Sequence, residues 1–220
     1  MDIGQMLNES FAYAKEGLWG KWVNWLLLII SAIIFPLLLG YTMEIMRGKK
    51  PAPPLENWGR MFIDGLKLFV VGIIYALPVI ILAIVLIGGS VLLFMNPNAL
   101  IEGLGTFFIG LIIIIVVAVL ISLISTMGNV RLSRTNHMGE AFNFHAIFGH
   151  IGRIGWGNYF FALLVMDIII GVIVLLIALI PVAGGFINLI LAPAYSIFTA
   201  RYITQIYDSV PASTGPEKVT

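Results

Sequence analysis

The sequence predicts an all-α membrane protein with about five transmembrane helices and short amphipathic interfacial helices before several of them. Hydrophobic residues make up 60% of the chain and charged residues only 10%, whereas a typical soluble domain carries about 25% charged residues. A soluble fold of 220 residues could not bury so much apolar surface, but lipid solvates apolar side chains directly. Five apolar runs are long enough to cross a bilayer, and they cover residues 22–46, 68–94, 104–127, 156–180 and 186–206.

The segment before the first run predicts a helix that lies along the membrane surface. Ile3, Met6, Leu7 and Phe11 recur near helical spacing among polar and charged residues. Such a pattern is typical of an amphipathic helix in the interface. A frayed polar start of the chain is the alternative.

The first run, residues 22–46, starts with Trp22 and Trp25, as at the aromatic belt of a membrane. Pro36 lies within this run and predicts a kink, because proline interrupts the hydrogen-bond ladder of a helix. If Pro36 instead breaks the run into a re-entrant hairpin, the amino terminus changes sides of the membrane. The proline-rich residues 51–54 end the helical pattern that follows the run.

The later runs are separated by turn-forming and polar segments. A short amphipathic segment, residues 58–67, precedes the second run. The sequence Asn96-Pro97-Asn98 ends that run, and polar residues 128–155 follow the third run. The pair Gly184-Gly185 separates the fourth run from the fifth.

Lysine and arginine gather in two loops, residues 47–67 and 128–155, which the positive-inside rule places in the cytoplasm. Five crossings then put the amino terminus outside, whereas the re-entrant hairpin puts it in the cytoplasm. We expect one membrane domain over residues 1–210 and a disordered polar tail over residues 211–220.

No pattern in the sequence predicts an enzyme. Cysteine is absent, which excludes thiolate metal sites and cysteine nucleophiles. The histidines, His137, His145 and His150, lack the spacing that places two metal ligands on one helical face. The 23 glycines are scattered and form no phosphate-binding loop. We therefore expect no catalytic residue, no metal and no cofactor, and the net charge of +1 predicts no binding of nucleic acid.

One carboxylate lies in the middle of an apolar run. A charge at the position of Asp167 costs at least ~2.5–3.5 kcal/mol in a membrane, so Asp167 should face a partner or a watery cavity, or be protonated. In an antiparallel hairpin of the last two runs, Arg201 comes within reach of Asp167. The predicted intramembrane polar cluster consists of Asp167, Arg201, Thr199, Ser196 and Asn188. It is either a clamp between helices, in which Asn188 bonds the neighbouring helix, or an ion or proton site.

A resemblance to a known family rests on residues 30–80. The motifs that carry it are Pro36, Gly40-Tyr41, Pro54-x3-Trp58, Phe62-x-Asp64-Gly65 and Gly72-x2-Tyr75-x2-Pro78. This pattern resembles the domain of unknown function 4013 family, whose members are mostly archaeal membrane proteins. The family usually has an acid directly before the tryptophan, where this chain has Asn57. The resemblance implies an archaeal plasma membrane and brings no known activity, cofactor or catalytic residue.

Two function classes follow from these observations. The first is a non-enzymatic membrane scaffold or interaction protein in the cell membrane, with membrane lipid and a homo-oligomer as its partners. The second is a small ion or solute channel or transporter that uses Asp167, because proline-kinked helices can line substrate sites. The scaffold predicts lipid-dependent binding and no solute flux, whereas the channel predicts a hydrated cavity that reaches Asp167.

Overall fold

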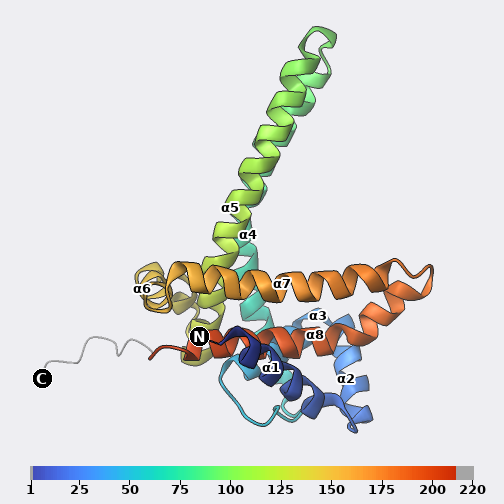
Figure 1. Cartoon of the computed structure of the whole chain (residues 1–220), viewed down its shortest axis with the longest axis vertical. Coiled ribbons are helices and arrows are strands. Elements are labelled where there is room, and N and C mark those ends of the chain that lie inside the picture. Colours follow the sequence, from blue (N-terminus) through green and yellow to red (C-terminus); the bar gives the residue numbers. More distant parts are fainter. Residues whose placement is uncertain (1, 212–220) are drawn as a thin grey trace, which may run out of the picture. The chain divides into compact units, whose positions relative to one another are not determined.

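A computed structural model of the protein describes residues 2–211, and every regular element in that range is a helix (Figure 1). The predicted all-α class is therefore confirmed. The described residues fall into two compact units, which we call unit 1 (the described part of residues 1–69 and 127–220) and unit 2 (residues 70–126). The elements are α1 (Ile3–Leu18), α2 (Trp22–Ile33), α3 (Phe35–Met46), α4 (Trp58–Phe94), η1 (Pro97–Ala99), α5 (Leu100–Thr135), η2 (Met138–Phe142), α6 (Phe144–Ile154), α7 (Trp156–Ala178) and α8 (Ala183–Asp208).

The single domain over residues 1–210 stays a prediction. A polar tail was predicted over residues 211–220. Except for Pro211, these residues lie outside the described part of the chain. Both units contain part of α4 and part of α5, so the chain passes from unit 1 into unit 2 and back within these two helices.

Four helices in the described chain, α4, α5, α7 and α8, are long and apolar enough to cross a membrane. The protein is thus a multi-pass membrane protein, with four long helices where the sequence predicted about five spans. The difference lies in residues 22–46, which form α2 and α3 with a non-helical Ile34 between them. Pro36 explains the break, because its ring conflicts with the carbonyl four residues before it, whereas the first turn of a new helix accommodates proline.

In unit 1, α1 packs lengthwise against α8 (Figure 1). The side chain of Asp2 accepts a hydrogen bond from the backbone N–H of Gln5 at 3.0 Å, which caps the start of α1. Gln205 on α8 donates to the backbone oxygen of Met6 and to the hydroxyl of Ser10, at 3.1 and 2.7 Å. The predicted helix at the start of the chain is therefore present, while its location in the membrane interface stays a prediction.

The core of unit 1 gathers side chains from α1, α2, α3, α8 and the start of α4. Its largest members include Tyr13, Leu28, Tyr41, Met61 and Ile197, all of them buried. On another face of α8, Tyr202 donates to the backbone oxygen of Ala162 on α7 at 3.0 Å. The helix α8 thus holds α1, α3 and α7 together.

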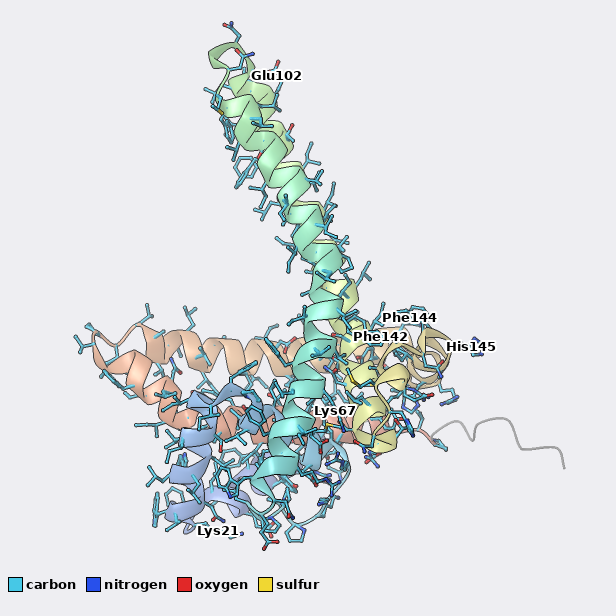
Figure 2. All side chains as sticks on the ribbon, turned by 180° about the vertical axis from the view of Figure 1, so that it is seen from behind. Lys21, Lys67, Glu102, Phe142, Phe144 and His145 are labelled. Atoms are coloured by element: carbon cyan, nitrogen blue, oxygen red, sulfur yellow. The ribbon has the colours of Figure 1, made fainter. Side chains whose placement is uncertain are left out.

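Unit 2 is a helical hairpin made of residues 70–94 of α4 and residues 100–126 of α5, joined through η1 (Figure 1). Close packing at two glycines holds the pair, since a Cβ at Gly110 would lie 3.0 Å from Leu86 and a Cβ at Gly103 would lie 2.8 Å from Phe94. Most of the large apolar side chains of this hairpin are exposed. Figure 2 shows them pointing outward along both helices, with the carboxylate of Glu102 near the loop. This surface suits a lipid environment.

Candidate functional site

A cluster of charged side chains lies in unit 1, where the end of α3 meets the start of α4 and the end of α5. We call it the ionic cluster, and its centre is Arg47. Arg47 donates to Glu44, to Asp64 Oδ2 at 2.7 Å and to the backbone oxygen of Ser133 at 3.3 Å. Asp64 is 2% exposed and Glu44 is 8% exposed, so both carboxylates are removed from solvent.

Three further cations surround these two acids. Lys67 bridges Asp64 Oδ1 at 3.1 Å and the Asn136 side-chain oxygen at 3.0 Å, and thereby joins α4 to the end of α5. Lys49 pairs with Glu44, and Arg60 lies 3.7 Å from Glu44 and 3.6 Å from Asp64. Because cations outnumber the acids, the cluster repels a divalent metal ion and acts as a fastening between helices.

The close approach of α3 and α4 places Glu44 and Asp64 together. A Cβ at Gly40 would lie 1.7 Å from the backbone oxygen of Met61, and a Cβ at Gly65 would lie 1.7 Å from the backbone oxygen of Pro36. Only glycine allows the two backbones to touch in this way. Tyr41 adds a hydrogen bond from its hydroxyl to the backbone oxygen of Pro53 at 3.1 Å.

The architecture of long apolar helices fastened by an ionic cluster defines a polytopic helical membrane protein. Residues 25–182 match the family described as Protein of unknown function (DUF4013), and the chain belongs to this family. Motif residues named from the sequence, among them Pro36, Gly40, Tyr41, Asp64 and Gly65, meet at the crossing of α3 and α4. Comparisons with curated proteins and with solved structures found no match.

A second polar group lies in the segment that follows α5. Arg131 donates to Glu140, and this hydrogen bond holds the pKa of the Glu140 carboxyl below its usual value. On α6, His150 is buried, and its Nε2 lies 2.9 Å from the backbone oxygen of Tyr207. Burial lowers the pKa of His150. Arg134 pairs with Asp208 at 2.8 Å, so the ends of α5 and α8 are also joined.

The structure does not bring the predicted polar cluster together. Asp167 is exposed on α7, whereas Arg201 is buried on α8 with its guanidinium carbon 5.3 Å from the centre of the Tyr13 ring on α1. Within the described residues, no ion pair joins Asp167 to Arg201. The helix period explains the error, because Tyr202 points to α7 and the residue before it is rotated by about 100° around α8.

The other three members of that cluster lie along α8. Ser196 and Thr199 are half-buried there. Asn188 donates to the backbone oxygen of Val174 on α7 at 3.2 Å and accepts a hydrogen bond from Tyr195 at 3.3 Å. The interhelical role predicted for Asn188 is therefore confirmed.

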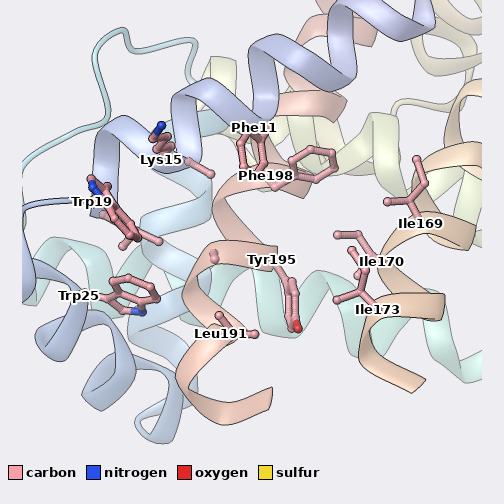
Figure 3. Close-up of a pocket in the computed structure, with 13 residues that line it drawn as sticks. Phe11, Lys15, Trp19, Trp25, Ile169, Ile170, Ile173, Leu191, Tyr195 and Phe198 are labelled. Carbon is pink, nitrogen blue, oxygen red and sulfur yellow. The ribbon is translucent and has the colours of Figure 1, made fainter. Parts of the chain in front are cut away.

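An apolar cavity, which sequence reasoning missed, lies in unit 1 among α1, α2, α7 and α8. Its volume is about 590 Å³, within the range of small-molecule sites. Figure 3 shows Phe11, Trp19, Trp25, Tyr195 and Phe198 around it, with the isoleucines of α7 on the facing side. Lys15 lines its edge on α1. The one signal in the sequence was the aromatic side chains near the first apolar run, which were interpreted only as a membrane belt.

Proposed function

We propose that this protein is a non-enzymatic membrane scaffold that retains a lipid in the apolar cavity between α1 and the α7–α8 hairpin. The observation that carries this proposal is the lining of the cavity, which is made almost entirely of aromatic and aliphatic side chains. An apolar cavity is a poor site for water, whereas an acyl chain fills it favourably.

The edge of the cavity suits the polar end of such a lipid. The exposed side chain of Lys15 can lay its aliphatic stem along the apolar wall and keep its ammonium group in the headgroup region. Trp25 is fixed in the wall, because its Nε1 donates to the backbone oxygen of Ile190 at 2.9 Å. Tryptophan beside a cation is typical of the interface between lipid and water.

The pairing of the charged groups supports a scaffold rather than an enzyme. In the ionic cluster, both buried acids are held by cations, so neither is poised as a general acid or base. We further propose the cell membrane as its location and a homo-oligomer as its assembly, since unit 2 exposes apolar side chains that can pack against a second copy. Nucleic acid is not among the proposed partners.

Filling the cavity tests the proposal. Ala194→Phe puts a ring into the cavity, and Ala12→Phe adds the same ring to the exposed face of α1 as a matched control. We expect Ala194→Phe to lose a tightly retained lipid that the wild type and Ala12→Phe keep, as measured by native mass spectrometry after mild delipidation. Equal lipid retention in all three proteins would contradict the proposal.

A flux assay distinguishes the scaffold from the channel alternative. In proteoliposomes, the wild type and Asp167→Asn should show equal, background ion and proton flux across pH. Flux that the substitution removes would replace the scaffold by the channel, because exposed Asp167 would then have to line a pathway in an assembled form.

A further inference from the structure

A second cavity in unit 1 is polar, and it lies between the start of α1 and the end of α8. Its volume is about 320 Å³. Two cations line it, Arg201 from α8 and Lys50 from the loop after α3. It is separate from the apolar cavity, whose residues on α1 begin at Phe11.

Arg201 has no polar partner among the residues that the structure describes. Its residue is 4% exposed, and its guanidinium carbon lies 5.3 Å from the centre of the Tyr13 ring. No described carboxylate lies within ion-pair distance of it, and no described acceptor receives a hydrogen bond from it. A guanidinium has five N–H donors, so one without a protein acceptor bonds water or a ligand in the cavity that it lines.

The neighbouring side chains do not supply that acceptor. The phenol of Tyr13 donates to the backbone oxygen of Lys49 at 2.9 Å, and burial raises the pKa of Tyr13 to about 12, so it stays neutral. Three acids also line the cavity, and each has another partner. Asp2 caps Gln5, Glu9 accepts from the Gln5 side chain at 2.8 Å, and Asp208 pairs with Arg134.

We propose that Arg201 and Lys50 bind a phosphate group in this cavity. The planar fork of arginine matches two phosphate oxygens, and the flexible ammonium of lysine adds a second positive charge. The three acids that line the cavity oppose an anion, so binding depends on direct hydrogen bonds from Arg201 and Lys50, and a polyanion is disfavoured further. Arg201 and α1 lie outside the residues matched by the family, whereas Lys50 lies within them.

Two sources supply a phosphate group here, a phospholipid headgroup and a free phosphate anion. The cavity lies beside the basic loop and the end of α8, and basic segments next to membrane spans attract anionic lipid headgroups. The shared chemistry is a phosphate held by a buried guanidinium. This site does not depend on the apolar cavity, so Ala194→Phe leaves it intact and the two proposals fail separately.

Thermal unfolding of the full chain in a neutral, phosphate-free detergent tests the proposal in two arms. One arm adds inorganic phosphate, and the other adds phosphatidylglycerol in mixed micelles. We expect at least one of them to raise the midpoint of unfolding of the wild type in a saturable way. A rise of the midpoint with inorganic phosphate identifies a free anion as the source. A rise with phosphatidylglycerol alone identifies the lipid headgroup.

Substitutions locate the effect. Arg201→Gln should weaken the apparent affinity at least tenfold, and Arg201→Lys should weaken it less, because it keeps the charge and loses the fork. Lys21→Gln removes one exposed positive charge remote from the cavity and should bind as the wild type does. If Arg201→Gln does not fold, the apparent affinities of Arg201→Lys and Lys50→Gln are compared with that of the wild type instead. The proposal is overturned if neither probe stabilises the wild type, or if the Arg201 variants respond as Lys21→Gln does.

Discussion

At the scale of single residues, glycine at the crossing of α3 and α4 lets the two backbones touch. The contact of Gly65 with the backbone of Pro36 leaves no volume for a side chain. We expect Gly65→Ala to push the helices apart and to lower the free energy of unfolding by about 1–3 kcal/mol, as overpacking does. Thermal unfolding in detergent measures this loss.

Gly59→Ala is the matched control for that substitution. Gly59 also belongs to α4, but nothing lies within 4 Å of the position that its Cβ would take. Alanine is the better helix former, so this variant should be as stable as the wild type or slightly more stable. Equal losses in the two variants would mean that the crossing is looser than the structure shows.

His150 predicts a pH dependence of stability. Burial holds its pKa below the ordinary value of 6.5, so the folded protein keeps the imidazole neutral where the unfolded chain binds a proton. Its contribution is complete above pH 6.5 and is lost as the pH falls from there towards the lowered pKa. Glu140 also has a lowered pKa, but its contribution is lost only below its ordinary value of 4.5.

Unfolding midpoints between pH 7.5 and 5.5 therefore isolate His150. We expect the wild type to lose stability across this range. His150→Gln keeps an N–H donor for the backbone oxygen of Tyr207 and cannot titrate, so its midpoint should change less with pH. A wild type as insensitive to pH as His150→Gln would show that His150 is not neutral in the folded state.

Side-chain partners were the part that the sequence could not predict. The level of Asp167 and Arg201 along their helices was a sound inference from a tight hairpin, but the direction of each side chain depends on rotation about the helix axis. Neighbours from distant parts of the chain decide that rotation. Here α1, which lies almost 200 positions before Gln205 in the sequence, takes the face of α8 that carries Arg201.

At the scale of elements, four of the five long apolar runs were predicted correctly, because a long apolar helix depends on local chemistry. The helices α4, α5, α7 and α8 follow from length and hydropathy alone. Whether Pro36 kinks a helix or ends it was an open choice, since both satisfy the same local rule. The structure decides it through the packing of α2 and α3 against α8 and against each other.

The broken first run leads to a prediction about topology. Gln5 lines the same cavity as Lys50 and Ser209, so the start of α1 lies beside the basic loop and the end of α8. With four crossings, these three positions share the cytoplasmic side, and Asn98 at the far end of unit 2 lies outside. Four crossings match the hairpin alternative, so we expect the amino terminus in the cytoplasm.

Single cysteines test this arrangement directly, because the chain has no native cysteine. In intact cells, an impermeant maleimide should label Asn98→Cys and should leave Gln5→Cys and Ser209→Cys unlabelled until the membrane is opened. Labelling of Gln5→Cys from outside, together with Asn98→Cys, would restore five crossings.

At the scale of the whole molecule, the division into two units leads us to expect that unit 1 folds without unit 2. The ionic cluster, the core around Tyr41 and both cavities consist of residues of unit 1. Unit 2 contributes two crossings, and removing both keeps α7 and α8 in their original orientation. Lys67 and Asn136 are hydrogen-bonded, so the two ends that remain after such a deletion belong to neighbouring helices.

We therefore expect a variant in which about eight glycine and serine residues, spanning ~16 Å on average, replace residues 70–126 to insert and fold. Its unfolding midpoint should stay within about 4 °C of the midpoint of unit 1 in the full chain. A change of about 1 kcal/mol in the free energy of unfolding produces such a shift in a domain of this size. Retention of phosphate-dependent stabilisation by the variant would show that the site at Arg201 is intact. Aggregation of the variant, with loss of the protected core in hydrogen exchange, would mean that the hairpin is required for folding, and that a scaffold role cannot be assigned to unit 1 alone.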